Sequence, residues 1–165
     1  MSKVKTFAQV WRAVQKDRKA GKKIVATNGC FDILHVGHVQ NLENAKKLGD
    51  VLVVGVNSDA SVRKNKGPLR PIIPVKDRAA LLAALRCVDY VFIFSEKTPF
   101  AWIQKLKPDV HVKAEDTKKH PDFKAQKEAI KKTGGKFMLL PLVPGRSTTK
   151  IIETVVARYS KQKTK

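Results

Sequence analysis

The chain has 165 residues, 42% of them apolar, and its 34 lysines and arginines outnumber 14 aspartates and glutamates to give a formal charge of +20. This length and composition predict one globular domain whose core needs no disulfide or metal ion, and no stretch approaches the roughly 20 apolar residues of a membrane-spanning helix. The first residues lack the apolar centre of a secretion signal, and Cys30 and Cys87 form no CxxC pair, so we expect a cytoplasmic protein with reduced thiols.

Apolar runs alternate with helical patterns along the chain. The predicted strands cover residues 24–26, 51–57, 88–94, 109–113 and 136–142, and the unbroken apolar run of the second is typical of a parallel sheet. Helices are predicted after a capping box at Thr6 and Gln9, from His38, Asp77, Thr98 and Phe123, and from Ser147 to Tyr159. We interpret residues 58–74, which hold Gly67 and three prolines, as irregular.

This alternation predicts the α/β class, with a single Rossmann-like domain and an open, five-stranded parallel sheet covered by helices on both faces. The expected division is an N-terminal helix in residues 1–22, a core in residues 23–158 and a basic tail in residues 159–165. Ligands of such sheets bind beyond the carboxyl ends of the strands. Four polar segments follow predicted strands there: residues 28–38, 58–74, 113–116 and 143–149.

Residues 23–42, KIVATNGCFDILHVGHVQNL, carry the strongest signal. A buried strand leads through a glycine-bearing loop into a helix start, where free N–H groups and the helix dipole favour a phosphate. His35 and His38 are three residues apart and can reach one ligand, and Gly37 leaves room for it. The alternatives are two surface histidines or two metal ligands, but no third ligand stands at a suitable spacing.

The segment TNGCFDILHVGH resembles the signature loop of the HxGH nucleotidyltransferase superfamily, and within it the bacterial ADP-heptose synthase adenylyltransferase domain. Residues 57–74, 77–91, 106–116 and 147–152 resemble the same family in the same order. The resemblance covers roughly residues 23–156. It implies transfer of AMP from ATP to D-glycero-β-D-manno-heptose 1-phosphate, with Mg²⁺ accompanying ATP and pyrophosphate as the second product.

The resemblance also implies roles for particular residues, and none of these is assigned as a direct metal ligand. The catalytic residues would be His35, His38 and Lys66. The nucleotide-binding residues would be Thr27, Asn28, Gly29, Phe31, Asp32, Gly37, Asp116, Ser147, Thr148 and Thr149. The acceptor-binding residues would be Asn57, Asp59, Arg70 and Arg78, with the arginines able to bind a phosphate through two N–H groups. Asp32 could help to hold Mg²⁺ or cap local N–H groups, and the sequence leaves both open.

The chain departs from the family at residues 114–116. The family usually has a glycine pair before the aspartate, whereas this chain has Ala114 and Glu115 before Asp116. The extra side chains would crowd a bound nucleotide or redirect Glu115, so base and ribose recognition are affected more than the chemistry.

Other functions compete with this interpretation. The same chemistry could serve another acceptor, as in a cytidylyltransferase acting on glycerol 3-phosphate or a flavin adenylyltransferase. The high charge also fits a basic nucleic-acid-binding protein. No aromatic platform accompanies the lysines, so we expect a solvated surface, no specific nucleic-acid partner and no membrane partner. Many members carry a sugar kinase in the same chain; here we expect a separate kinase, and a homodimer is expected for the family.

Overall fold

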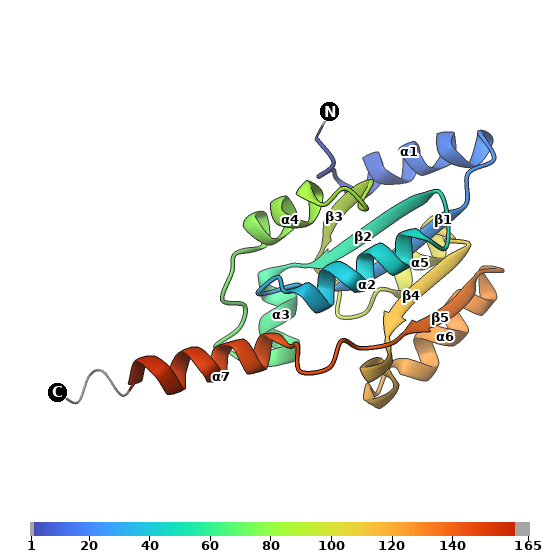
Figure 1. The fold of residues 1–165 in the computed structure, drawn as a ribbon. Helices are drawn as coiled ribbons and strands as arrows, with labels where there is room; N and C mark the ends of the chain where they lie inside the picture. The colour runs from blue at the N-terminus through green and yellow to red at the C-terminus, as the bar shows by residue number, and fades with distance from the viewer. Residues whose placement is uncertain (1, 161–165) are drawn as a thin grey trace.

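The computed structural model describes residues 2–160, and its centre is an all-parallel sheet of five strands in the order β3-β2-β1-β4-β5 (Figure 1). The strands are β1 (Ile24–Gly29), β2 (Val51–Asn57), β3 (Tyr90–Phe94), β4 (Val110–Ala114) and β5 (Lys136–Leu140). Every residue of β2 is buried, as its unbroken apolar run predicts. Because all strands are parallel, their carboxyl ends meet at one edge of the sheet.

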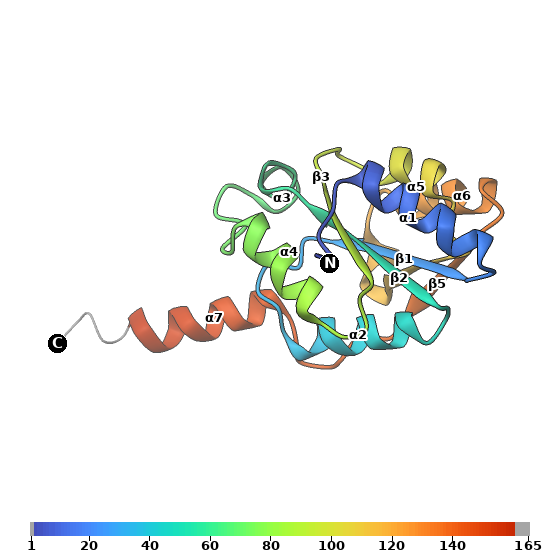
Figure 2. The ribbon, with the colours of Figure 1, turned by 90° about the horizontal axis from the view of Figure 1, so that it is seen from above.

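Helices cover both faces of this sheet, which confirms the predicted fold class. The helices are α1 (Phe7–Lys19), α2 (Val36–Lys46), α3 (Asp59–Lys66), α4 (Val75–Ala84), α5 (Phe100–Leu106), the 3-10 helix η1 (Glu115–Lys119), α6 (Phe123–Lys132) and α7 (Thr148–Tyr159). Figure 2 shows α1, α5 and α6 on one side of the sheet and α2 and α4 on the other. Each side has its own core.

The two cores draw on alternate residues of the same strands. On β1, Ile24 and Ala26 face the core beneath α1, α5 and α6, whereas Val25 faces the core beneath α2 and α4. This alternation is what a strand buried on both faces requires, because successive side chains point to opposite sides. Large apolar groups such as Phe92 and Leu52 complete the two cores and fix the sheet on which the strand ends are held.

Several predicted boundaries are confirmed. The capping box forms at the start of α1, where Thr6 and Gln9 bond reciprocally, and Ser147 caps α7 by accepting a hydrogen bond from the Lys150 N–H. Helix α2 begins two residues earlier than predicted, at Val36.

Two predictions were wrong. Residues 58–74 are not wholly irregular, because Ser58 accepts a hydrogen bond from the Ser61 N–H and starts α3, which ends before Gly67 at a φ of 94°. The Thr98 cap is also absent. Pro99 occupies the N-cap position of α5 and makes no side-chain cap hydrogen bond.

Helix α7 differs from the others because it extends away from the sheet (Figures 1 and 2). None of its residues is buried, and Val155, Val156 and Tyr159 are at least half exposed. Residues 161–165 of the predicted basic tail lie outside the described residues. Within residues 2–160, no helix is both long enough and apolar enough to cross a membrane.

Candidate nucleotide-binding site

The HxGH loop, residues 28–38, connects the carboxyl end of β1 with the start of α2. His35 occupies the N-cap position in extended conformation and makes no side-chain cap hydrogen bond. The first N–H groups of α2 are therefore directed toward the strand ends, where the helix dipole also favours an anion. Gly29 and Phe31 shape the turn: Phe31 has a positive φ of 47°, and a side chain at Gly29 would meet the Phe31 ring at 3.1 Å.

His35 and His38 lie face to face, with ring centroids 3.8 Å apart and an angle of 19° between the planes. The Nδ1 atoms of both rings are buried and have no hydrogen-bond partner among the described residues. Burial, and secondarily the neighbouring His35, lower the pKa of His38 to about 4, and burial also lowers the pKa of His35. Both rings are therefore neutral near pH 7, and each has hydrogen-bonding capacity left for a ligand. A side chain at Gly37 would come within 3.1 Å of the His35 ring.

Asp32 ties the HxGH loop to the segment before α4. Its carboxylate accepts hydrogen bonds from the backbone N–H of Ile72 and Ile73, both 2.8 Å from Oδ1, and Oδ2 pairs with Arg70. Burial favours a higher pKa for Asp32, but these N–H groups and Arg70 outweigh it and lower the pKa. The sequence left open whether Asp32 holds Mg²⁺ or caps N–H groups. The structure favours the second role, but the N–H groups are those of Ile72 and Ile73 and not local ones.

Arg78 is fully buried and holds the same loop from α4. Its guanidinium donates to the carbonyl oxygens of Cys30, Ile73 and Asn57 and to the carboxylate of Asp59, with 2.7 Å between Nη2 and Oδ1. These contacts use nearly all of its N–H groups. The arrangement argues against the predicted role of Arg78 as a clamp on the acceptor phosphate.

The other residues predicted to bind the acceptor belong to the same internal network. The Asn57 side chain is buried and donates to the Ser61 hydroxyl, 2.9 Å away, and Asp59 is paired with Arg78. Arg70 is paired with Asp32. In this structure the four residues fasten the strand ends to one another, a role that their spacing in the sequence did not reveal.

The start of α7 meets the start of α2. The Thr148 hydroxyl donates to the carbonyl oxygen of Ile33, 3.4 Å away, and a side chain at Gly37 would reach the Cβ of Arg146 at 3.4 Å. Gly145, with a φ of 70°, allows the turn before the Ser147 cap, and Thr149 is exposed in the first turn. The amino-terminal ends of α2 and α7, where each helix dipole is positive, thus lie close together.

The remaining predicted residues differ in whether their side chains already have a hydrogen-bond partner. The Thr27 hydroxyl donates to the Val112 carbonyl oxygen, whereas the side-chain oxygen of Asn28 is buried without a partner among the described residues. Lys66 is exposed at the end of α3, and Asp116 is exposed in η1. Lys113, which our assignment of site residues omitted, donates from its ammonium to the Asn28 carbonyl oxygen at 2.8 Å. The sequence did contain a signal for this residue, because Lys113 is a charged residue near the end of an apolar strand.

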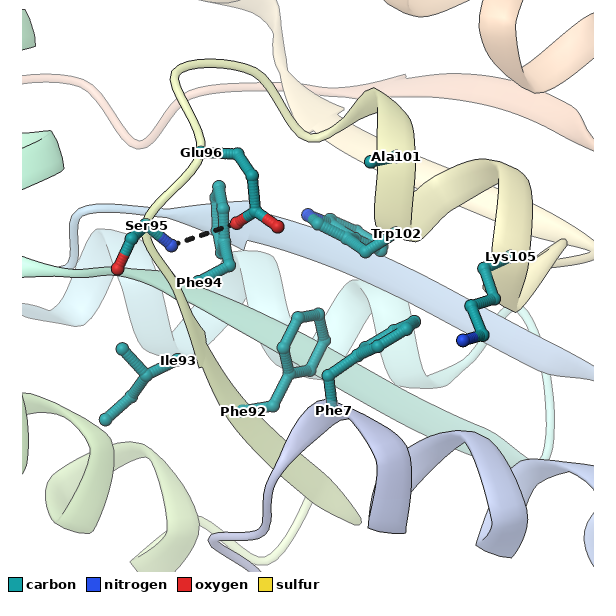
Figure 3. A pocket seen from close by; sticks show the side chains of 9 residues that line it. All are labelled: Phe7, Phe92, Ile93, Phe94, Ser95, Glu96, Ala101, Trp102 and Lys105. Atoms are coloured by element: carbon teal, nitrogen blue, oxygen red, sulfur yellow. Dashed lines mark hydrogen bonds between the residues drawn. The ribbon is translucent and has the colours of Figure 1, made fainter.

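A separate hollow of about 700 Å³ lies beside β3 and between α1 and α5, and Figure 3 shows its lining. Aromatic side chains dominate it, with Glu96 and Lys105 as its charged residues. None of the predicted site residues lines this hollow, so we do not assign it to the phosphate site.

The described residues do not form a metal cage. Within residues 2–160, no group of three or more His, Cys, Asp or Glu side chains could hold a metal ion. Asp32 does not fit as a Mg²⁺ ligand either, because both of its oxygens already accept N–H groups.

Comparison with protein families supports the geometry. Residues 26–154 match the family model described as cytidylyltransferase-like. The chain belongs to this family of nucleotidyltransferases. The matched residues include the HxGH loop, all of β2, β3, β4 and β5, and the first half of α7.

Curated members of the family extend beyond the matched region. The Bifunctional protein HldE of Syntrophotalea carbinolica is 48% identical over 158 residues, which is 96% of this chain and 32% of the relative. The Bifunctional protein HldE of Geobacter metallireducens is 48% identical over 161 residues, 98% of this chain and 32% of the relative. The chain therefore spans about a third of the length of these relatives.

Solved structures agree with the family and the fold. A lipopolysaccharide core biosynthesis protein from Thermoplasma volcanium has a TM-score of 0.61 and 33% identity, with 74% of this chain and 98% of that chain covered. A pantoate-β-alanine ligase from Francisella tularensis also has a TM-score of 0.61, over 98% of this chain and 80% of that chain, but at 14% identity it shows the fold alone.

Proposed function

We propose that this chain transfers AMP from ATP to D-glycero-β-D-manno-heptose 1-phosphate, giving ADP-heptose and pyrophosphate. A phosphate oxygen of the sugar attacks the α-phosphorus of ATP, a new P–O bond forms, and the bond between that phosphorus and the bridging oxygen of the β-phosphate breaks. Pyrophosphate leaves with that oxygen. Such a reaction needs mainly positioning and neutralisation of charge.

The observation that carries this proposal is the meeting of the α2 and α7 helix starts beside the stacked histidines. Free N–H groups and two imidazoles with unpartnered Nδ1 atoms supply hydrogen-bonding groups and little else. Donors of this kind stabilise negative charge that grows on phosphate oxygens in the transition state. In the proposal, His35, His38 and Lys66 act on the phosphates, and residues 147–149 bind the triphosphate.

The identity of the sugar phosphate is inferred from relatives of this chain, not from the geometry of the site. It is supported by relatives named HldE and by a similar structure described as a lipopolysaccharide core biosynthesis protein. Mg²⁺ would accompany the triphosphate, since Asp32 offers it no free oxygen. A sugar kinase would supply the acceptor, either as a separate protein or as a fused domain. A homodimer stays a prediction.

A pyrophosphate-release assay tests the proposal directly. The purified chain is given ATP, CTP, GTP or UTP with each of a panel of acceptors: heptose 1-phosphate, glucose 1-phosphate, glycerol 3-phosphate and flavin mononucleotide. We expect release to be fastest with ATP and heptose 1-phosphate and absent without an acceptor. Preference for CTP with glycerol 3-phosphate, or for ATP with flavin mononucleotide, would keep the chemistry and replace the substrate. No release with any pair would refute the proposed function.

A further inference from the structure

Lys113 lies at the carboxyl end of β4, beside the strand that leads into the HxGH loop. Thr27 of β1 pairs with Val112 of β4, so Lys113 stands next to Asn28. Its Nζ is 2.8 Å from the carbonyl oxygen of Asn28. The β4 side chain is thereby held across the end of β1, at the edge of the sheet where parallel sheets bind their ligands.

Two cations lie next to the HxGH loop, the buried Arg78 and the half-buried Lys113, and they differ in how many N–H groups remain free. The Arg78 guanidinium donates to three carbonyl oxygens and one carboxylate of the protein. An ammonium has three N–H groups, and Lys113 has one protein acceptor among the described residues, the Asn28 carbonyl. Two N–H groups of Lys113 are therefore available to a ligand, whereas Arg78 has almost none.

The charges around Lys113 come from every side of the strand ends. Cys30 faces it from the HxGH loop, Lys66 from α3 and Asp116 from η1, and His111 precedes it on the same face of β4. Of these, Lys66 carries a positive charge and Asp116 a negative one, while Cys30 and the fully buried His111 are neutral near pH 7. The ammonium of Lys113 thus has no close carboxylate partner within salt-bridge distance in the described residues.

We infer that Lys113 is a phosphate-binding residue of this site, and that its two free N–H groups contact phosphate oxygens of the bound nucleotide from the β4 side. The inference rests on the proposed function for its ligand, a nucleoside triphosphate. The same ammonium, through Asn28, also holds the end of β1 in place. The sequence analysis assigned Arg78 to the acceptor phosphate, whereas this inference assigns Lys113 to the phosphates of the nucleotide.

Titration of Lys113 gives the inference a second readout. Burial lowers the pKa of Lys113 to about 8, and Lys66 acts in the same direction, while Cys30 and Asp116 oppose the shift. Below this pH the ammonium is charged and binds phosphate; above it the neutral amine binds phosphate less well. ATP affinity should therefore decline as the pH rises from about 8 to 9.5, a range in which the terminal phosphate of ATP is already fully ionised.

The test is calorimetric titration with ATP, and separately with inorganic pyrophosphate, at pH 7 to 9.5. It uses the wild-type chain, Lys113→Met, Lys113→Arg and the matched surface control Lys131→Met, which removes an exposed lysine of α6. We expect Lys113→Met to weaken ATP binding roughly 10- to 100-fold at pH 7, the loss typical of a charge-assisted hydrogen bond. Lys131→Met should bind like the wild type.

The pH series separates binding from mere structural support. The decline above pH 8 should disappear in Lys113→Met and also in Lys113→Arg, since arginine stays charged throughout. If Lys113→Met binds ATP as the wild type does, or if Lys113→Arg keeps the wild-type pH profile, the inference is overturned. Should Lys113→Met fail to fold, the Lys113→Arg profile decides alone.

The same preparations keep the inference and the proposed function apart. Binding of ATP that depends on Lys113, without transfer to any sugar phosphate, supports the inference and contradicts the proposed reaction. Pyrophosphate release by the wild type, with unchanged ATP affinity and pH profile in the variants, supports the reaction and contradicts the inference.

Discussion

The HxGH loop and helix α7 both contribute to the candidate site, but the protein holds them in opposite ways. The loop is fastened by three charged side chains: Asp32 reaches the segment before α4, Arg78 reaches back from α4, and Lys113 reaches across from β4. Helix α7 has no buried residue, and its side-chain hydrogen bond to another element is made by its first residue, Thr148.

The difference shows which part of the candidate site the fold holds in place without a ligand: the HxGH loop, and not helix α7. In the proposed reaction the histidines of the loop must keep their positions while charge develops on the phosphates, and the contacts described above fix the loop without a ligand. The start of α7 offers N–H groups and hydroxyls, and the rest of the helix makes few demands on the fold. We therefore expect substitutions in the loop's fastenings to act globally and substitutions in α7 to act locally.

Removing the central fastening should have the largest effect. Arg78→Met leaves the Asp59 carboxylate and three carbonyl oxygens without their donor, and loss of one partner from a buried charged network costs about 3–5 kcal/mol. Urea denaturation should show this loss, and Arg86→Met, an exposed neighbour beyond α4, should stay within about 0.5 kcal/mol of the wild type. An unchanged midpoint for Arg78→Met would mean that the loop is held by other contacts.

Removing a group that the loop positions should affect turnover and spare stability. His38→Ala should lower the turnover number by about 10² or more, because a lost donor to a developing oxyanion costs a few kcal/mol of barrier. The unfolding midpoint should shift little, since the ring has no hydrogen-bond partner to lose through Nδ1. His120→Ala, at an exposed position, serves as the matched control. Near-normal turnover of a folded His38→Ala protein would contradict the phosphate site.

Acid should weaken the folded state through its buried histidines. Burial lowers the pKa of His38 to about 4 and of His111 to about 3, below the ordinary value of 6.5. The folded state thus binds fewer protons than the unfolded chain, so stability is full above pH 6.5 and falls as the pH drops toward 4. For the fully buried His111 the loss is on the order of 2 kcal/mol by pH 5.

Denaturation in urea at pH 7.5, 6 and 5 measures this dependence. His111→Leu should reduce the loss of stability between pH 7.5 and pH 5. The loss that remains should be the part due to His38 in the HxGH loop. The substitution should not weaken the protein at pH 7.5, because neither ring nitrogen of His111 has a hydrogen-bond partner among the described residues. A slope that is identical in His111→Leu and wild type would show that His111 does not contribute.

The smallest expected effect lies in α7. Ser147→Ala removes the cap that accepts from the Lys150 N–H and should weaken the helix by about 1 kcal/mol. Amide exchange within residues 150–153 should accelerate, while the global free energy of unfolding changes by less than about 0.5 kcal/mol. Val156→Ser, on the same exposed helix, is the control for an apolar side chain without burial. A large global loss in Ser147→Ala would show that α7 is integral to the fold.

The sequence predicted features that depend on local pattern. The strand β2, the capping box of α1 and the Ser147 cap are all legible from neighbouring residues, and they were predicted correctly. Helix α3 was missed because Gly67 and three prolines dominated the reading of a segment whose first part starts with its own serine cap. Short helices beside turn residues are difficult to separate from loops by composition.

The part of the site that the sequence did not predict depends on burial. Arg78 is a basic residue after a basic loop, and nothing in that pattern tells whether its guanidinium meets a substrate or Cys30, Ile73 and Asn57. Its Asp59 partner is 19 residues away and the Cys30 carbonyl is 48 residues away. Lys113 was omitted because its hydrogen-bond partner Asn28 is 85 residues away in the sequence, so nothing near Lys113 indicates that it reaches the HxGH loop.

The exposed course of α7 has a consequence for proteolysis. A helix of 12 residues with no buried side chain receives little support from tertiary packing, and helices of this length are marginal in water. It should open from the end far from Thr148, so of the two trypsin sites within α7 the one after Arg158 should be cut before the one after Lys150, while the sheet stays intact. Because the helix start lies beside the HxGH loop, occupation of that site by ATP should slow the second cut more than the first.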